Sequence, residues 1–122
     1  MLTSSPLPPA SVGAAAPDVP PHALDIEALR AAAGQAVKAL KVMANEDRLL
    51  LLCQLSQGEM SVGELEAALD IHQPTLSQQL GVLRNEGVVN TRRDGKRICY
   101  SLADPRLLQI MQLMHALYCP KD

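Results

Sequence analysis

The side chains best suited to recognition chemistry lie in residues 71–84. Placed on a helix, Leu76, Leu80 and Leu83 form one apolar stripe at i, i+4, i+7 spacing. A glutamine amide can pair with adenine, and a serine or threonine hydroxyl can reach base edges or phosphates. The side chains of this kind around the stripe are Gln73, Thr75, Ser77, Gln78 and, nearer the core edge, Gln79. A surface helix that is merely rich in glutamine is the alternative interpretation.

Positive charge is concentrated directly after this stretch. The whole chain has a formal charge of −2, but residues 84–97 carry five basic and two acidic side chains and are net +3. Such a local excess matters more for nucleic-acid binding than the total charge does. The basic residues are Arg84, Arg92, Arg93, Lys96 and Arg97.

Three cysteines, Cys53, Cys99 and Cys119, are the candidate reactive groups. The sequence has neither a bilayer-spanning apolar run nor a convincing signal peptide, so we expect a cytoplasmic protein with no membrane partner. Thiols in that compartment are usually reduced, and an odd number does not fit a disulfide framework. Redox sensing or metal binding is therefore a more natural role than structural cross-linking.

These groups are expected to lie on one folded domain. The length of 122 residues and the 48% hydrophobic content support a single aliphatic core. Residues 1–23 hold six of the nine prolines and no periodic apolar face, which predicts a disordered tail. The folded DNA-binding and dimerisation domain is predicted over residues 24–122.

Two helices are predicted before the glutamine-rich stretch. The first runs from the N-cap Asp25 to about Met43, with apolar residues at 3-4 spacing. The second begins at the N-cap Asn45 and ends near Gly58. Four consecutive leucines at 49–52 indicate that this second helix is buried on most sides.

A helix-turn-helix follows. Ser61 and Glu64 have the spacing of a capping box and predict a short helix over 62–69. Residues 70–73 form a tight turn, and the glutamine-rich stretch is the next helix, which ends near Gly87. Two short helices joined in this way, the second with a polar outer face, are typical of DNA-reading domains.

A basic hairpin is predicted after the helix-turn-helix. The pair Asp94-Gly95 separates two strand-like runs, 88–93 and 96–102, in which Ile98, Tyr100 and Leu102 alternate inward. The basic residues crowd its tip. A solvated turn would explain them, but the preceding helix-turn-helix favours a wing that grips phosphates.

The last predicted helix starts with Asp104 as N-cap and Pro105 at the first helical position. Apolar residues cover nearly its whole circumference, which implies a partner helix. The first and last helices are therefore the expected homodimer interface, and a two-fold dimer would present two reading helices about one DNA turn apart.

This order of elements resembles the ArsR family of winged-helix repressors over about residues 26–119. The specific motifs are QPTLSQQL at 73–80, VLRNEGVV at 82–89, the pair Arg92-Arg93 and the triplet Tyr100-Ser101-Leu102. The resemblance implies a mainly α fold of five helices with a β-hairpin wing, a homodimer, double-stranded operator DNA as partner, and no enzymatic activity. Gln79 departs from many members, in which a histidine is common, and this affects the detailed base preference.

The metal sites known in that family are not matched. Residues 61–65 contain no thiol, and the last helix has Arg106, Leu117 and Pro120 where ligands are needed. His72 and His115 have no spaced partner and are interpreted as ordinary histidines. No metal site and no cofactor is predicted.

Two cysteines match another branch of the family. Cys53 on the second helix and Cys119 at the end of the last helix resemble the dithiol pair of sulfide- and oxidant-responsive repressors of the BigR and SqrR type. The resemblance implies that reactive sulfur species or oxidants link the two thiols through a di- or polysulfide and that DNA is then released. Cys99 has no counterpart in this pair.

Three alternatives remain open. Cys53 alone would also suit a buried apolar role in a leucine-rich helix. A metal-responsive repressor could use the cysteine thiolates, with Cys99 included. A non-DNA interaction module or an enzyme is a third class, although the sequence has no nucleophile–base pair, paired-carboxylate motif or phosphate loop.

Overall fold

The computed structural model describes residues 25–120 of the chain, so the predicted disordered tail lies outside the described residues. The chain divides into two units between Gln35 and Ala36. Helix α2, Ile26–Met43, crosses this boundary, and all the other elements belong to the second unit. No helix within residues 25–120 has the length and apolar character needed to cross a membrane.

Local capping explains where the first helices begin. The Asp25 carboxylate accepts a hydrogen bond from the Glu27 amide (2.9 Å), next to the first turn of α2. Helix α3, Glu46–Leu55, starts at Asn45, whose side chain accepts from the Arg48 amide (3.0 Å). Both predicted caps are therefore present. The second helix ends earlier than expected, because residues 56–58 already form a turn.

The helix-turn-helix is formed by α4, Val62–Leu69, and α5, Thr75–Asn85. The Ser61–Glu64 capping box is present in both directions, at 3.2 and 2.8 Å. Asp70 ends α4 in the left-handed conformation (φ 55°). Helix α5 starts after Pro74, so Gln73 lies in the turn that was predicted over residues 70–73.

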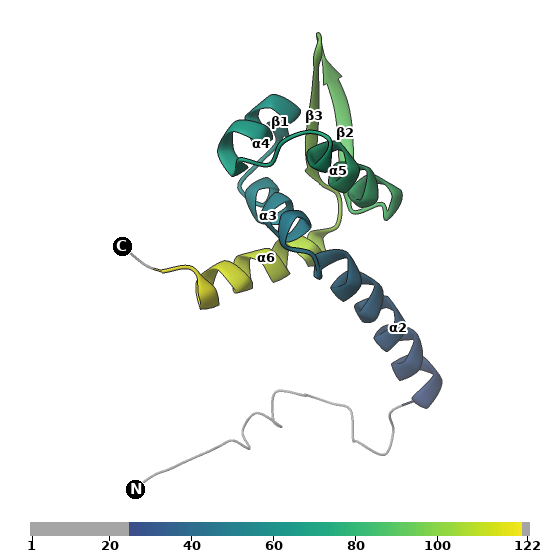
Figure 1. The fold of residues 1–122 in the computed structure, drawn as a ribbon. Coiled ribbons are helices and arrows are strands. Elements are labelled where there is room, and N and C mark those ends of the chain that lie inside the picture. The colour runs from purple at the N-terminus through teal and green to yellow at the C-terminus, as the bar shows by residue number, and fades with distance from the viewer. Residues whose placement is uncertain (1–24, 121–122) are drawn as a thin grey trace, which may run out of the picture. The chain divides into compact units, whose positions relative to one another are not determined.

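A three-stranded antiparallel sheet in the order β1-β3-β2 contains the hairpin. Strands β2, Val89–Asp94, and β3, Arg97–Leu102, pair with Asp94 opposite Arg97, and Gly95 supplies the positive φ (66°) of the tight turn. Figure 1 shows this hairpin projecting beyond the helices of the second unit. Strand β1, Met60–Ser61, was not predicted, and it pairs with the other edge of β3.

Burial along β3 departs from simple alternation. Tyr100 faces the core as expected, but the neighbouring Cys99 is also buried, at 3% exposure. The reason is that β3 is the central strand, with β1 and β2 on its two edges and with α3, α4 and α6 all in contact with it. Cys99 is therefore enclosed, and the outer face predicted for it is covered.

Helix α6, Pro105–Tyr118, closes the core, and its N-cap Asp104 accepts from the Arg106 amide (2.9 Å). Leu107 and Met111 are fully buried, whereas the second half of the helix is exposed. The core is aliphatic, as the composition predicted. Five described helices with a β-hairpin wing after the helix-turn-helix confirm the predicted fold class. The largest fully buried side chains are Leu51, Leu52, Leu65, Leu76, Leu83, Leu107 and Met111.

Candidate nucleic-acid interface and thiol pair

The outward face of α5 presents most of the predicted reading residues to solvent. Leu76, Leu80 and Leu83 hold the other face in the core. Thr75 and Gln79 are half-buried and the remaining candidates are exposed. The exposed candidates are Gln73, Ser77, Gln78 and Arg84.

Two of the glutamines make bonds within the protein. The side-chain oxygen of Gln73, Oε1, accepts a hydrogen bond from the Ser77 backbone amide (3.1 Å). It therefore satisfies an N–H group in the first turn of α5 that would otherwise lack a partner. The side-chain oxygen of Gln79, Oε1, accepts a hydrogen bond from Nη1 of Arg48 on α3 (2.9 Å). The Gln78 side chain makes no hydrogen bond to any residue in the described part of the chain, and it is free to meet a base.

The four cationic side chains of the wing differ in whether they are paired with a carboxylate. Arg92 forms a two-pronged pair with Glu59, with Nε and Nη2 each 2.7 Å from a carboxylate oxygen. Arg97 Nη2 lies 3.3 Å from Glu64 Oε1. Arg93 reaches only the Gly95 carbonyl (3.4 Å), and Lys96 has no side-chain partner within residues 25–120. Two of the four predicted phosphate contacts are thus paired with carboxylates and two are available.

Electrostatics keep those carboxylates ionised. The hydrogen bond from Arg92 lowers the pKa of Glu59, and the bonds to Ser61, followed by the charge of Arg97, lower the pKa of Glu64. Glu64 was identified from the sequence only as a capping residue, and Glu59 was not identified. The missing signal was β1, because its pairing beside β3 brings Glu59 next to Arg92.

His72 lies in the turn before α5 within a small charged cluster. Its Nε2 lies 2.7 Å from Asp70 Oδ1 and its Nδ1 3.4 Å from Glu66 Oε2. Hydrogen bonds to Glu66 and then Asp70 raise the pKa of the exposed His72 ring. This cluster ties the end of α4 to the turn and gives His72 a structural partner.

Cys53 lies near the end of α3 and faces α6. It is half-buried, and its thiol donates a weak hydrogen bond to Met111 Sδ on α6, 3.6 Å away. Burial raises the pKa of this thiol, and the negative charge of Cys119 raises it further. The second effect means that the two predicted sensing thiols lie within electrostatic range of each other.

Cys119 directly follows α6 and is exposed. Its amide donates to the His115 carbonyl (3.1 Å) and caps the helix. Cys99 is buried at the sheet, in register with Ser61 on β1 and Arg92 on β2. All three thiols are free. Within residues 25–120 no three His, Cys, Asp or Glu side chains gather in a way that could hold a metal ion.

The helix-turn-helix, its exposed polar helix and the basic hairpin define a winged helix-turn-helix protein. Residues 45–91 match the family model described as "Bacterial regulatory protein, arsR family". The biofilm growth-associated repressor of Agrobacterium fabrum is 48% identical over 81% of this chain and 85% of that protein. The crystal structure of the repressor BigR from Xylella fastidiosa is 42% identical, with a TM-score of 0.73, over 80% of this chain and all of that one. Reduced HlyU from Vibrio cholerae is 41% identical, with a TM-score of 0.74, over 77% and 99% of the two chains.

The chain belongs to the arsR family of bacterial regulatory proteins. It is a transcriptional regulator and not an enzyme, as the resemblance implied. BigR and HlyU among its relatives also agree with the branch that the sequence motifs indicated.

Proposed function

We propose that this protein is a homodimeric transcriptional repressor that binds palindromic operator DNA when reduced and releases it when Cys53 and Cys119 are bridged. The observation that carries the proposal is the placement of the two thiols. Cys53 lies on α3 and Cys119 directly follows α6, which packs on α3, and the charge of Cys119 acts on Cys53. A bridge between them would join a core helix to the end of the last helix.

On the DNA side, α5 enters the major groove. Thr75, Ser77 and Gln78, with the amide nitrogen of Gln73, meet base edges or nearby phosphates. Arg84 and the wing cations contact the phosphate backbone, which gives affinity that falls with salt. The exposure of this polar face and of Arg93 and Lys96 supports the assignment.

The proposed dimer uses the apolar faces that remain uncovered. On α6, Leu117 and Tyr118 are 68% and 77% exposed, and Leu113 is exposed as well. Val37 and Leu40 on α2 are also exposed. A solved fragment of Mb0332 from Mycobacterium bovis, 31% identical, is described as a homodimeric winged helix-turn-helix DNA-binding domain. We infer the same assembly here, through the first and last helices.

The switching chemistry begins at the accessible thiol. The Cys119 thiolate attacks the outer sulfur of an organic persulfide, R–S–SH, gaining one sulfur while R–S⁻ leaves. The Cys53 thiolate then attacks the Cys119-bound sulfur of the new persulfide, which forms a disulfide and releases HS⁻. If Cys53 is also persulfidated, condensation of the two groups gives a trisulfide and H₂S. With peroxide, Cys119 becomes a sulfenic acid, and Cys53 displaces water.

A metal-responsive mechanism is the weaker candidate. AntR, described as an antimony-specific repressor, is a structural neighbour at 35% identity and a TM-score of 0.64. A thiolate metal site here would need Cys99 to join the other two cysteines. Cys99 is buried in the sheet beside Ser61, and no three potential ligands gather within the described residues. We therefore favour thiol chemistry.

The test compares operator affinity for reduced, peroxide-treated and persulfide-treated protein. The operator is a palindromic duplex selected by repeated binding to reduced wild-type protein, and affinity is measured by fluorescence anisotropy. The operator affinity of the wild-type protein should fall at least about tenfold after treatment, which is a typical size for coupling between two sites. Cys53→Ser and Cys119→Ser should stay bound, and Cys99→Ser should respond as wild type does.

Mass spectrometry of the treated protein supplies the chemical assignment. A Cys53–Cys119 peptide pair, with or without additional sulfur, is expected only in protein that has released DNA. Release by Cys53→Ser under persulfide would overturn the mechanism. Release caused by zinc or antimonite on reduced protein, and lost in Cys99→Ser, would establish the metal alternative instead.

A further inference from the structure

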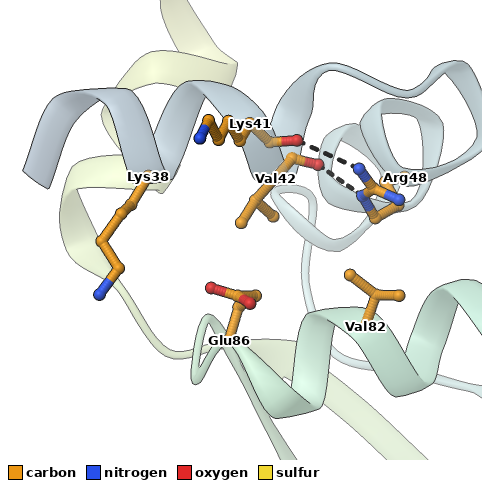
Figure 2. A pocket seen from close by; sticks show the side chains of 6 residues that line it. All are labelled: Lys38, Lys41, Val42, Arg48, Val82 and Glu86. Carbon is orange, nitrogen blue, oxygen red and sulfur yellow. Dashed lines mark hydrogen bonds between the residues drawn. The ribbon is translucent and has the colours of Figure 1, made fainter. Parts of the chain in front are cut away.

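Arg48 joins three helices through one side chain. From its place on α3, its Nε donates to the Val42 carbonyl (2.7 Å) and its Nη2 to the Lys41 carbonyl (3.1 Å), both in the last turn of α2. Figure 2 shows these two bonds. Its third arm, Nη1, donates to Gln79 on α5 (2.9 Å). The guanidinium is therefore fixed at the point where α2, α3 and α5 meet.

The physical role of the first two bonds is clear from helix chemistry. The last carbonyls of a helix lack intrahelical donors and carry partial negative charge, so a cation that donates to them is favourable. These bonds anchor the Arg48 fork to α2. The bond to Gln79 is different, because it reaches the middle of the helix that reads DNA.

A cavity of about 380 Å³ lies beside this junction. Figure 2 shows Val82 of α5 and Glu86, which directly follows that helix, across from Lys38 and Val42 of α2. Close packing normally holds neighbouring elements in one arrangement. Here an open pocket lies between the last turns of α2 and α5, so the directional bond from Arg48 to Gln79 matters more for the angle of α5.

The other end of α3 carries the thiol of the proposed switch. Cys53 follows Arg48 by five residues, about 7.5 Å along the helix axis. Helix α3 has ten residues with no proline or glycine, so it moves as one rigid piece. A bridge that pulls Cys53 toward Cys119 therefore displaces Arg48 at the same time.

We propose that Arg48 and Gln79 are positioning residues that couple the state of the Cys53–Cys119 pair to the reading helix. When α3 is displaced, the planar guanidinium of Arg48 cannot keep its hydrogen bonds to both the α2 carbonyls and Gln79. Loss or redirection of the Gln79 bond turns α5 away from its DNA-binding orientation. This inference rests on the proposed thiol switch and adds the route by which it reaches the DNA.

The test uses the ratio of operator affinities in the reduced and persulfide-bridged states. Gln79→Met keeps the length of the side chain but removes the acceptor, and it should reduce the ratio by about fivefold or more. Gln79→Glu keeps an acceptor for Arg48. It should bind DNA more weakly in both states because of charge repulsion, yet keep the ratio within about twofold of wild type. Gln57→Ala, at an exposed glutamine just after α3, is the control and should leave both values unchanged.

A second measurement follows the junction without DNA. In ¹⁵N-labelled protein, the Gln79 side-chain amide and the Arg48 Nε resonances should shift on bridging in wild type, and the Arg48 shift should shrink in Gln79→Met. Mere structural support would change the melting temperature while the affinity ratio stays constant.

The outcomes separate the two proposals. If wild-type protein, with the bridge verified by mass spectrometry, keeps its affinity, the thiol switch fails and the coupling fails with it. If wild type releases DNA and Gln79→Met keeps the wild-type ratio, only the coupling is overturned, whatever happens to its affinity. A reduced ratio in Gln79→Met that Gln79→Glu restores supports the coupling.

Discussion

The wing carries exposed charged groups, whereas the surroundings of the thiol pair disfavour a charge on Cys53. On the wing, all four cations are exposed, and ion pairs with carboxylates hold two of them in place. At the thiol pair, burial and the charge of Cys119 both oppose ionisation of Cys53. The comparison teaches that the proposed DNA-binding surface holds exposed charge in the structure, two of its cations being fixed by ion pairs, whereas the environment of Cys53 disfavours the charged thiolate.

The largest effect should come from the core beneath the thiol pair. Met111→Ala removes a fully buried side chain that contacts Cys53, and we expect a loss of about 2–5 kcal/mol in the free energy of unfolding. Denaturant unfolding measures this loss. The matched control on the same helix is the exposed Gln109→Ala, which should stay within about 0.5 kcal/mol of wild type. An equal loss in both variants would show that α6 as a whole, and not the contact with Cys53, is sensitive.

On the wing, the available cation should matter more than the paired one. Arg93→Ala should weaken operator binding about tenfold and reduce the slope of log affinity against log salt by about one. Removing the paired arginine together with its carboxylate, as Arg92→Ala with Glu59→Gln, deletes no net charge and should cost about twofold. Anisotropy titrations at several salt concentrations measure both. If the double variant loses as much as Arg93→Ala, Arg92 leaves Glu59 to contact DNA.

Releasing the paired Arg92 from Glu59 should strengthen operator binding, whereas removing Arg93 should weaken it. Glu59→Gln frees Arg92 from its two 2.7 Å bonds and should tighten operator binding about threefold. Asp94→Asn, at the turn of the hairpin, removes the same charge without breaking an ion pair, so it isolates the effect of charge alone. Equal tightening in the two variants would show that the Arg92–Glu59 pair does not restrain binding.

The pH dependence of this difference follows from the lowered pKa of Glu59. A carboxylate with a lowered pKa stays ionised through neutral pH and loses its charge only as the pH falls below the ordinary range for glutamate. The ratio of affinities between Glu59→Gln and wild type should therefore be constant from about pH 8 to about pH 6. A ratio that changes steeply between these pH values would mean that the titration of another group controls DNA binding by the wing.

Local patterns in the sequence were sufficient for most of the fold and for the outline of the site. Asn45, Asp104 and the Ser61–Glu64 box marked helix starts correctly, because a cap depends on residues three or fewer positions apart. The pairings of Glu59 with Arg92 and of Arg48 with Gln79 were not predictable in this way. They join residues more than thirty positions apart, and one of them depends on β1, a two-residue strand without a pattern of its own.

The smallest effect concerns the thiol itself and tests the other half of the comparison. Burial raises the pKa of Cys53, so the pH midpoint of its alkylation by iodoacetamide should lie above the ordinary value for cysteine. Cys119→Ser removes the second cause, the neighbouring negative charge. The midpoint should then fall but remain above the ordinary value, because the burial persists. Peptide mass spectrometry across a pH series measures this, with Cys99→Ser as the control that should leave the midpoint unchanged. An unchanged midpoint in Cys119→Ser would mean that the two thiols do not influence each other, and the bridge would then need a larger movement of α6 than the structure implies.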